Sequence, residues 1–235
     1  MSIQFSEKVA VSLFTVAATL MTPVLVSATT YNGANEAESE VFGSIIASDA
    51  GNEIPPVNPG EPSPEVDPDL VNPDRGEDYF SIRYVSQLNF GQTPHSSLPY
   101  VRQAYRDANT QILDEATGQY TAAENQVWIE DLRNNENRTD WVLTVQQTAD
   151  FMGGAVITMN PYVHAATTTN FGVHTPSSAL TLNLQPQNFA WAAQTDSTKA
   201  GDFAISMGEV TVSIPAGVGV STYETSLKWN LTAQP

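Results

Sequence analysis

The last part of the chain, "STYETSLKWNLTAQP", alternates large apolar and polar residues with a period of two. Side chains at positions i and i+2 of a β-strand point to the same face, so this rhythm predicts a strand with one buried and one solvated face. The opposite face reads Glu, Ser, Lys, Asn and Thr, which is typical of a half-buried strand. The apolar positions are Tyr223, Leu227, Trp229 and Leu231.

The segment "DWVLTV" repeats the Trp-x-Leu step through Trp141 and Leu143, and Val145 continues the apolar side. Periodicity favours burial of the tryptophans of both segments in a core. The alternative is a sugar-stacking platform, because tryptophan faces also bind glycans. Trp128 and Trp191 stand in less regular surroundings and are better candidates for partly exposed rings, although a position at the edge of the core is favoured for each. Amide side chains for a glycan are available at Asn134, Asn135, Asn137, Asn170 and Asn188, although Asn-rich loops are usually turns.

Short alternating segments recur from residue 79 to residue 235, separated by Gly, Pro, Asn, Ser and Asp clusters. About eight short strands joined by turns predict an all-β fold, an antiparallel β-sandwich of immunoglobulin-like or related type. The exception is "LPYVRQAYRDANTQI", residues 98–112, where Pro99 suits the first turn of a helix.

Residues 29–78 differ in composition from the rest of the chain. Twelve acidic residues accompany only Arg75, and the segment "NEIPPVNPGEPSPEVDPDLVNPD" carries seven prolines. Proline favours polyproline II and like charges repel, so we expect a disordered, extended, acidic leader. The apolar stretch "VFGSIIA" within it is either a pairing strand, a partner contact or a fluctuating segment, and its isolation favours the last of these.

The N-terminus has the pattern of a secretory signal peptide. Lys8 precedes an apolar run over residues 9–26, and small residues follow that suit cleavage after Ala28. The alternative is an uncleaved membrane anchor. We therefore expect a signal peptide at 1–28, a linker at 29–78, and one domain at 79–235 of an exported protein with no transmembrane segment after cleavage.

Composition narrows the function. A formal charge of -17 argues against nucleic acid and against anionic bilayers, and the lack of cysteine removes disulfides, thiolate metal sites and catalytic thiols. No motif of a hydrolase or metalloenzyme is present, so we expect no catalytic residues, no cofactor and no metal. The alternative is a metal shared by His164 and His174 with Asp150 or Asp196.

Four motifs in order, "QLNFG", "DWVLTV", "VTVSIPAGVGV" and "YETSLKWNLTAQP", make residues 79–235 resemble the WxL domain proteins of Gram-positive bacteria. The first Trp-x-Leu motif is carried by Trp141 and Leu143, and the second by Trp229 and Leu231. The resemblance implies non-covalent attachment to the cell wall through peptidoglycan, at the cell surface and partly extracellular. It also implies assembly with companion surface proteins. The alternative is a protein-interaction or adhesin subunit that docks a companion surface protein or host matrix.

Overall fold

The computed structural model is built almost entirely from β-strands, most of them paired antiparallel. This confirms the predicted all-β sandwich. Among the described residues one short helix occurs, α1 (Ala165–Phe171). The predicted signal peptide lies outside them and stays a prediction. The structure describes residues 29–46, 65–66, 70–76, 79–114, 119–133, 138–193 and 200–234.

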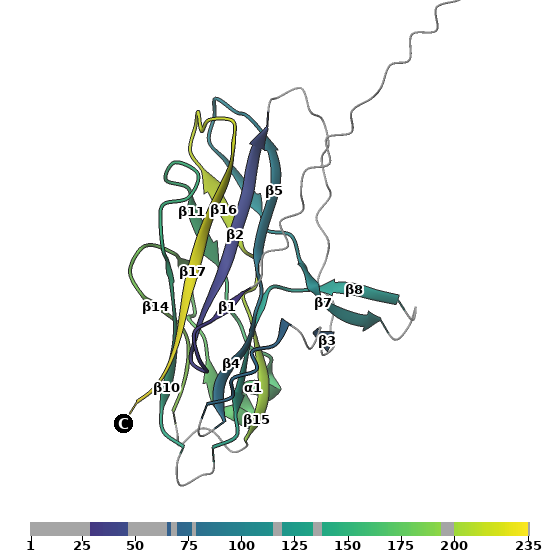
Figure 1. The fold of residues 1–235 in the computed structure, drawn as a ribbon, viewed down its shortest axis with the longest axis vertical. Helices are drawn as coiled ribbons and strands as arrows, with labels where there is room; N and C mark the ends of the chain where they lie inside the picture. Colours follow the sequence, from purple (N-terminus) through teal and green to yellow (C-terminus); the bar gives the residue numbers. More distant parts are fainter. Residues whose placement is uncertain are drawn as a thin grey trace, which may run out of the picture.

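The largest sheet contains seven strands, and both ends of the described chain contribute to it (Figure 1). Its pairs are antiparallel except for the parallel pair of β2 and β5. In spatial order the strands are β1 (Thr30–Tyr31), β2 (Glu36–Ile46), β17 (Ser221–Ala233), β10 (Trp141–Gln147), β14 (Gln187–Ala192) and β12 (Val173–His174). The seventh strand, β5 (Leu88–Pro94), stands outside this order and pairs with β2.

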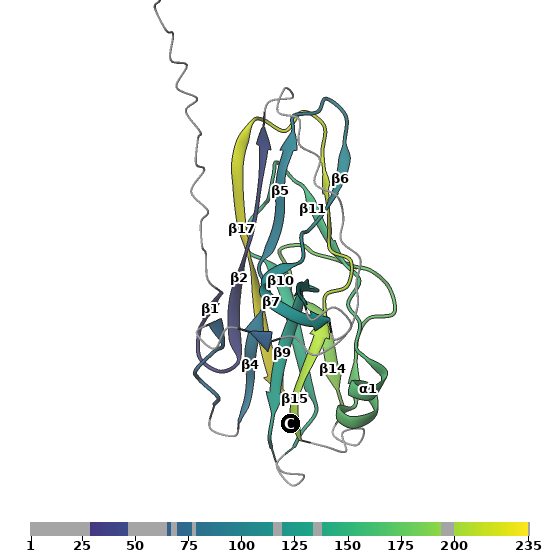
Figure 2. The same cartoon turned by 90° about the vertical axis from the view of Figure 1, so that its right-hand side faces the viewer.

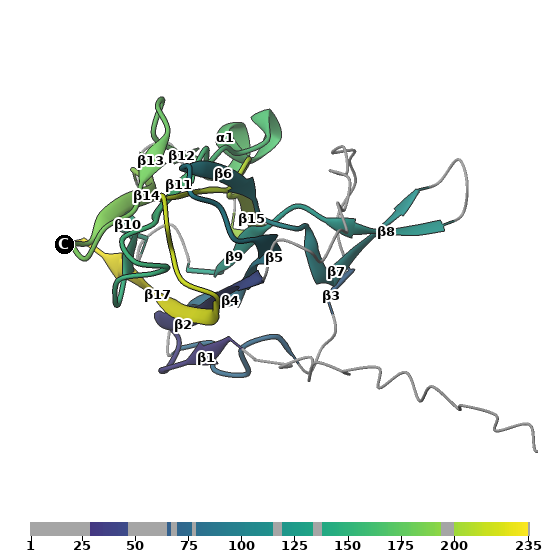
Figure 3. The ribbon, with the colours of Figure 1, turned by 90° about the horizontal axis from the view of Figure 1, so that it is seen from above.

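Three smaller sheets complete the fold. The first contains β13 (Leu180–Thr181), β11 (Val156–Met159), β16 (Thr211–Ile214) and β6 (Tyr100–Gln103). The second contains β15 (Gly201–Ser206), β9 (Gln126–Asp131) and β4 (Phe80–Val85), and the third β3 (Glu65–Val66), β7 (Asp107–Asp114) and β8 (Gln119–Ala123). Seen from above, the strands of the large sheet and of the first two smaller sheets surround one core, whereas the β7–β8 hairpin extends away from it (Figure 3).

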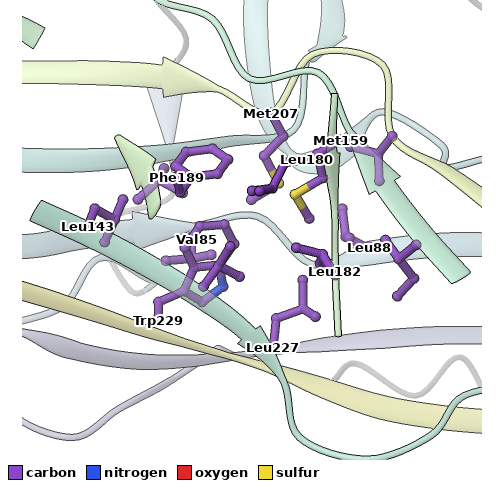
Figure 4. Packing of buried hydrophobic residues seen from close by; sticks show 14 of the residues in the cluster. Val85, Leu88, Leu143, Met159, Leu180, Leu182, Phe189, Met207, Leu227 and Trp229 are labelled. Carbon is purple, nitrogen blue, oxygen red and sulfur yellow. The ribbon is translucent and has the colours of Figure 1, made fainter. Parts of the chain in front are cut away.

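One hydrophobic core joins the large sheet to the two small sheets that face it. Leu143 of β10 and Leu227 and Trp229 of β17 point into it, and Phe189 of β14 meets them there (Figure 4). Burial of a large apolar side chain stabilises the fold by roughly 1.5–3 kcal/mol. The alternating apolar residues that sequence analysis placed on one face of each strand are therefore the residues that hold the sheets together.

The predicted disordered leader is wrong for residues 30–46. β2 lies between β17 and β5 (Figure 2), and it pairs with β17 from Glu36 to Ile45. Its inward side chains, among them Val41 and Ile45, are buried. The acidic residues mislead because they alternate with these positions, so each carboxylate stands on the outer face, where water solvates it. The prediction is also wrong for residues 65–66 and 70–76, where β3 pairs with β7 and Asn72 is buried and donates a 2.9 Å hydrogen bond to the carbonyl of Ile82. Residues 47–64, 67–69 and 77–78 of the predicted leader lie outside the described residues.

The predicted helix at residues 98–112 is also wrong. The segment forms strand β6, whose Tyr100 pairs with Ile214 of β16, and then most of strand β7. β6 is held by backbone pairing with β16, and the start of β7 is held by the hydrogen bonds of Asp107. These long-range contacts override the local preference of the segment for a helix.

A buried polar cluster joins the base of the β7–β8 hairpin to β4. Asp107 accepts hydrogen bonds from the hydroxyls of Tyr84 and Ser86, the latter at 2.6 Å, and from the backbone N–H of Asn109 at 2.9 Å. Burial first, and then the negative charge of Asp107, raise the pKa of Tyr84 above the usual range of tyrosine. The phenol therefore keeps its proton in the folded protein at pH values where the unfolded chain loses it.

We expect the free energy of unfolding to fall as the pH rises above about 10, the pKa of an unfolded tyrosine. The folded state then binds more protons than the unfolded state, and each such tyrosine lowers stability by ~1.4 kcal/mol per pH unit. Urea unfolding between pH 8 and pH 11 measures this slope. Tyr84→Phe should be less stable at pH 8 and show a flatter slope, and an unchanged slope would contradict the assignment. Tyr31, whose pKa burial also raises, accounts for a residual slope.

Candidate functional site

The two Trp-x-Leu steps lie side by side on the neighbouring antiparallel strands β10 and β17. Leu143 is the cross-strand partner of Leu231, and Val145 is the partner of Trp229. Both tryptophans and both leucines face the core. The repeat noticed in the sequence is therefore one structural unit, a pair of strands whose inner faces match across the sheet.

Trp229 is fully enclosed, with an exposed fraction of 0 %. Its indole N–H donates a 2.9 Å hydrogen bond to the hydroxyl of Ser39 on β2, and the ring of Phe189 meets it edge-on at a centroid distance of 4.9 Å. A buried indole needs such an acceptor. Sequence analysis missed Ser39, although its position among the inward residues of β2 follows from the period of two along "EAESEVFGSII".

Trp141 is buried as well, with an exposed fraction of 3 %. Its ring stacks on Phe203 of β15 at a centroid distance of 6.0 Å and packs against Phe80 of β4 at 6.4 Å. Leu227 is also buried, whereas Tyr223 is half-buried and its hydroxyl donates to the carbonyl of Gly219 at 2.8 Å. The motif residues thus join the large sheet to the small ones.

A buried ion pair is formed by two residues that precede Trp141 in the sequence. Arg133 binds both carboxylate oxygens of Asp131 at 2.9 Å, and its guanidinium lies 3.8 Å from the ring centre of Phe80. Arg133 also donates to the hydroxyl of Thr139 at 3.2 Å, just before β10. A two-pronged pair of this kind fixes geometry as well as charge. Asp131 and Arg133, which belong to the charged segment before the first motif, are therefore part of the interior.

A ligand cannot contact the enclosed indole of Trp229 without opening the core, so a binding surface on these strands has to lie on their outer face. On the outer face Val142 of β10 is the cross-strand partner of Trp191 of β14, and Trp191 is in turn the partner of His174 of β12. Trp191 has an exposed fraction of 38 %. Its ring and that of His174 are stacked at 27°, with centroids 6.3 Å apart.

A β-bulge creates this arrangement. The register between β10 and β14 shifts after Leu143, so that Phe189 and Ala190 are both fully buried. Asn188 and Trp191, on either side of them, are both exposed. A bulge re-aims side chains in this way and often lies beside a functional site. The sequence makes Trp191 a candidate for a partly exposed ring but favours a position at the edge of the core, and it does not predict the extra residue that turns the ring outward.

Trp191 borders an open depression of about 320 Å³ at the end of the sheet. Its chemistry is aromatic and polar, with two amide side chains and one carboxylate. We call this surface, with the adjoining His174, the Trp191 face. Of the amides proposed from sequence, Asn188 lies here, whereas Asn134, Asn135 and Asn137 lie outside the described residues. The lining residues are Asp140, Trp141, Val142, Asn188, Trp191, Ala192, Ala193 and Gln234.

The outer face of β2 and β17 is acidic. Glu36, Glu38 and Glu40 project from β2, and Lys228 lies 3.6 Å from Glu36. Burial first, and then the charges of Glu224 and Glu38, raise the pKa of Glu40. An anionic polymer that approaches this side of the sheet meets like charges, which are costly at low ionic strength.

The described residues contain no group of three or more His, Asp or Glu side chains arranged to hold a metal ion. His174 contributes to the Trp191 face, and His164 lies immediately before α1. Asp196, the other partner considered for them, lies outside the described residues. Within the same part of the chain, no helix is long and apolar enough to cross a membrane.

The paired strands make the chain an all-β protein with two Trp-x-Leu motifs on neighbouring strands. The family model described as WxL domain surface cell wall-binding matches residues 34–235, and the chain belongs to this family. It is a family of non-catalytic, cell-wall-binding domains, which places the protein at the cell surface or wall. The match includes β2. Comparison with curated proteins and with solved structures gives no significant match.

Proposed function

We propose that the protein is exported, with residues 1–28 as its signal peptide, and attaches non-covalently to the peptidoglycan of a Gram-positive bacterium through the Trp191 face. One observation carries this proposal: the motif tryptophans Trp141 and Trp229 are buried, whereas Trp191 is exposed on the outer face of the same sheet. The motifs then build the sheet, and its outer surface contacts the wall.

Charge supports an uncharged wall component. The chain carries a formal charge of -17, and the outer face of β2 is acidic next to β17. Phosphate-rich wall polymers are repelled by such a surface, whereas the glycan strands of peptidoglycan offer hydroxyl and amide groups that aromatic and amide side chains bind without charge pairing. We therefore expect wall binding that does not strengthen steeply when salt is lowered.

Co-sedimentation with protein-stripped Gram-positive cell walls tests the proposal. We expect the purified chain to pellet saturably and Trp191→Ala to bind at least about tenfold more weakly, because the loss of one stacked ring removes ~1.4 kcal/mol or more of binding energy. The matched control is Val101→Ala, which truncates a side chain that is 62 % exposed on β6, in another sheet. Circular dichroism verifies that both variants are folded.

The outcomes separate the two candidate functions. Equal pelleting of Trp191→Ala and the unaltered chain would move the attachment surface away from the Trp191 face. If the folded chain does not pellet with stripped walls but does pellet with walls that keep their proteins, peptidoglycan attachment is contradicted. A companion surface protein then holds the chain, as an interaction or adhesin subunit.

A further inference from the structure

We infer that the Trp191 face binds a sugar ring of an uncharged, N-acetylated glycan, and not the peptide stems or anionic polymers of the wall. The inference rests on the proposed function and names the chemical class that the same surface accepts. It follows from three features of the face: the aromatic rings, the polar groups around them, and the absence of a cation among the residues that line the depression.

The aromatic part is a surface of two rings. Trp191 and His174 are cross-strand partners, and their rings are stacked at 27° on the same side of the sheet. Val142 is the cross-strand partner of Trp191 on β10. The stack with His174 limits the rotamers of Trp191, so less entropy is lost on binding. The apolar C–H face of a pyranose ring packs on such a surface, as other flat apolar groups do.

The polar groups suit a ligand that both donates and accepts hydrogen bonds. Asn188 from β14, and Asp140 and Gln234 from the segments beside β10 and β17, line the same depression as Trp191. The backbone N–H of Gln234 donates to the carbonyl of Asp140 at 2.7 Å, which ties these two segments together. A carboxylate accepts from sugar hydroxyls, and an amide side chain both donates and accepts, as an acetamido group requires.

Charge and shape exclude the other wall components. Asp140 is the one charged residue among the eight that line the depression, and none of the eight is cationic. The carboxylates of peptide stems and the phosphates of anionic polymers call for Arg or Lys. The depression measures about 320 Å³ and is open, at the lower end of the range for small-molecule sites. This fits one or two rings of a chain that continues beyond it.

Titration with a defined sugar tests the inference on the full chain in its exported form. The probe is N-acetylchitotetraose, which has β-1,4 linkages and acetamido groups, and cellotetraose is the matched probe without acetamido groups. Binding is followed by tryptophan fluorescence and by the NMR signals of the histidine rings. We expect saturable binding of N-acetylchitotetraose with shifts of the His174 signals, and binding of cellotetraose at least about tenfold weaker, a difference of ~1.4 kcal/mol.

Variants assign the binding to this surface. Trp191→Ala should weaken binding of N-acetylchitotetraose by at least about tenfold, Trp191→Phe should recover part of it, and Val101→Ala should leave it unchanged. Asn188→Ala should reduce the difference in affinity between N-acetylchitotetraose and cellotetraose. All variants are compared by circular dichroism, and Asn188 is exposed, so its truncation tests the polar contacts without disturbing the core.

Failure of this inference and failure of wall attachment give different results. If walls pellet the chain but N-acetylchitotetraose at millimolar concentration moves no signal, the sugar assignment is overturned and attachment stands. Equal binding of both tetrasaccharides overturns the acetamido preference, and binding that survives Trp191→Ala overturns the site. If neither walls nor sugar bind, the proposed function fails as well.

Discussion

Removal of residues 29–46 is expected to leave a chain that does not fold. The loss of β2 exposes the edges of β17 and β5, uncovers the core where Val41 and Ile45 are buried, and leaves the indole N–H of Trp229 without Ser39. Each buried aliphatic side chain contributes roughly 1.5–3 kcal/mol and an orphaned buried donor costs ~1–3 kcal/mol, against a total stability of about 5–15 kcal/mol.

Comparison of residues 29–235 with residues 47–235 by circular dichroism and NMR measures this effect. The longer chain should give dispersed amide signals and a cooperative thermal transition, and the shorter chain should give neither. Glu38→Gln is the matched control within β2, because Glu38 lies on the outer face and its change should leave the transition in place. A shorter chain that melts like the longer one would show that β2 is not part of the folded core.

The second large effect is expected from Trp229→Ala. This change empties the centre of the core and removes the contacts with Phe189 and Ser39. Truncation of a buried tryptophan typically costs ~3–5 kcal/mol, a large share of the stability of one domain. In urea unfolding at pH 7 we expect a correspondingly lower midpoint or a chain unfolded without denaturant.

Trp191→Ala provides the matched comparison, because it removes the same side chain from the surface of the same sheet. Its effect on unfolding should stay within about 1 kcal/mol, since the ring is 38 % exposed and stacks on the surface ring of His174. Trp229→Ala should therefore lower the stability of the fold, whereas Trp191→Ala should weaken binding and leave the stability nearly unchanged. If Trp229→Ala unfolds at the same urea concentration as the unaltered chain, the core assignment of the second motif is wrong.

Strands whose pattern is regular could be predicted from the sequence. In β17 each large apolar residue is followed by a polar one, and β10 follows the same alternation from Leu143 onward, so local alternation is enough to identify the buried face. β2 follows the same rule, but its inward residues include Ala37 and Ser39, which are small. Against a background of acidic residues and prolines, small inward residues give little signal, although packing beside the large ring of Trp229 requires them.

The Trp191 face could be predicted less well from the alternation of apolar and polar residues. From the sequence, Trp191 is a candidate for a partly exposed ring with a core-edge position favoured, and Asn188 is one of the amides available to a glycan. That the two lie on one surface depends on the bulge in β14 and on the pairing with β12. Both depend on tertiary contacts, such as the packing of Phe189 against Trp229. The buried pair of Asp131 and Arg133 is hidden for the same reason, since charged residues near asparagines suggest a surface loop.

The pairing of β2 with β17 also means that the large sheet cannot be completed until the end of the chain is available. Ser39 and Trp229 are 190 positions apart in the sequence, yet one hydrogen bond joins them. During synthesis β2 has no neighbour on that side until β17, the last strand, emerges, and contacts between distant segments form slowly. If the chain is exported as proposed, it should cross the membrane before the sheet can close, in the unfolded form that a narrow export channel requires.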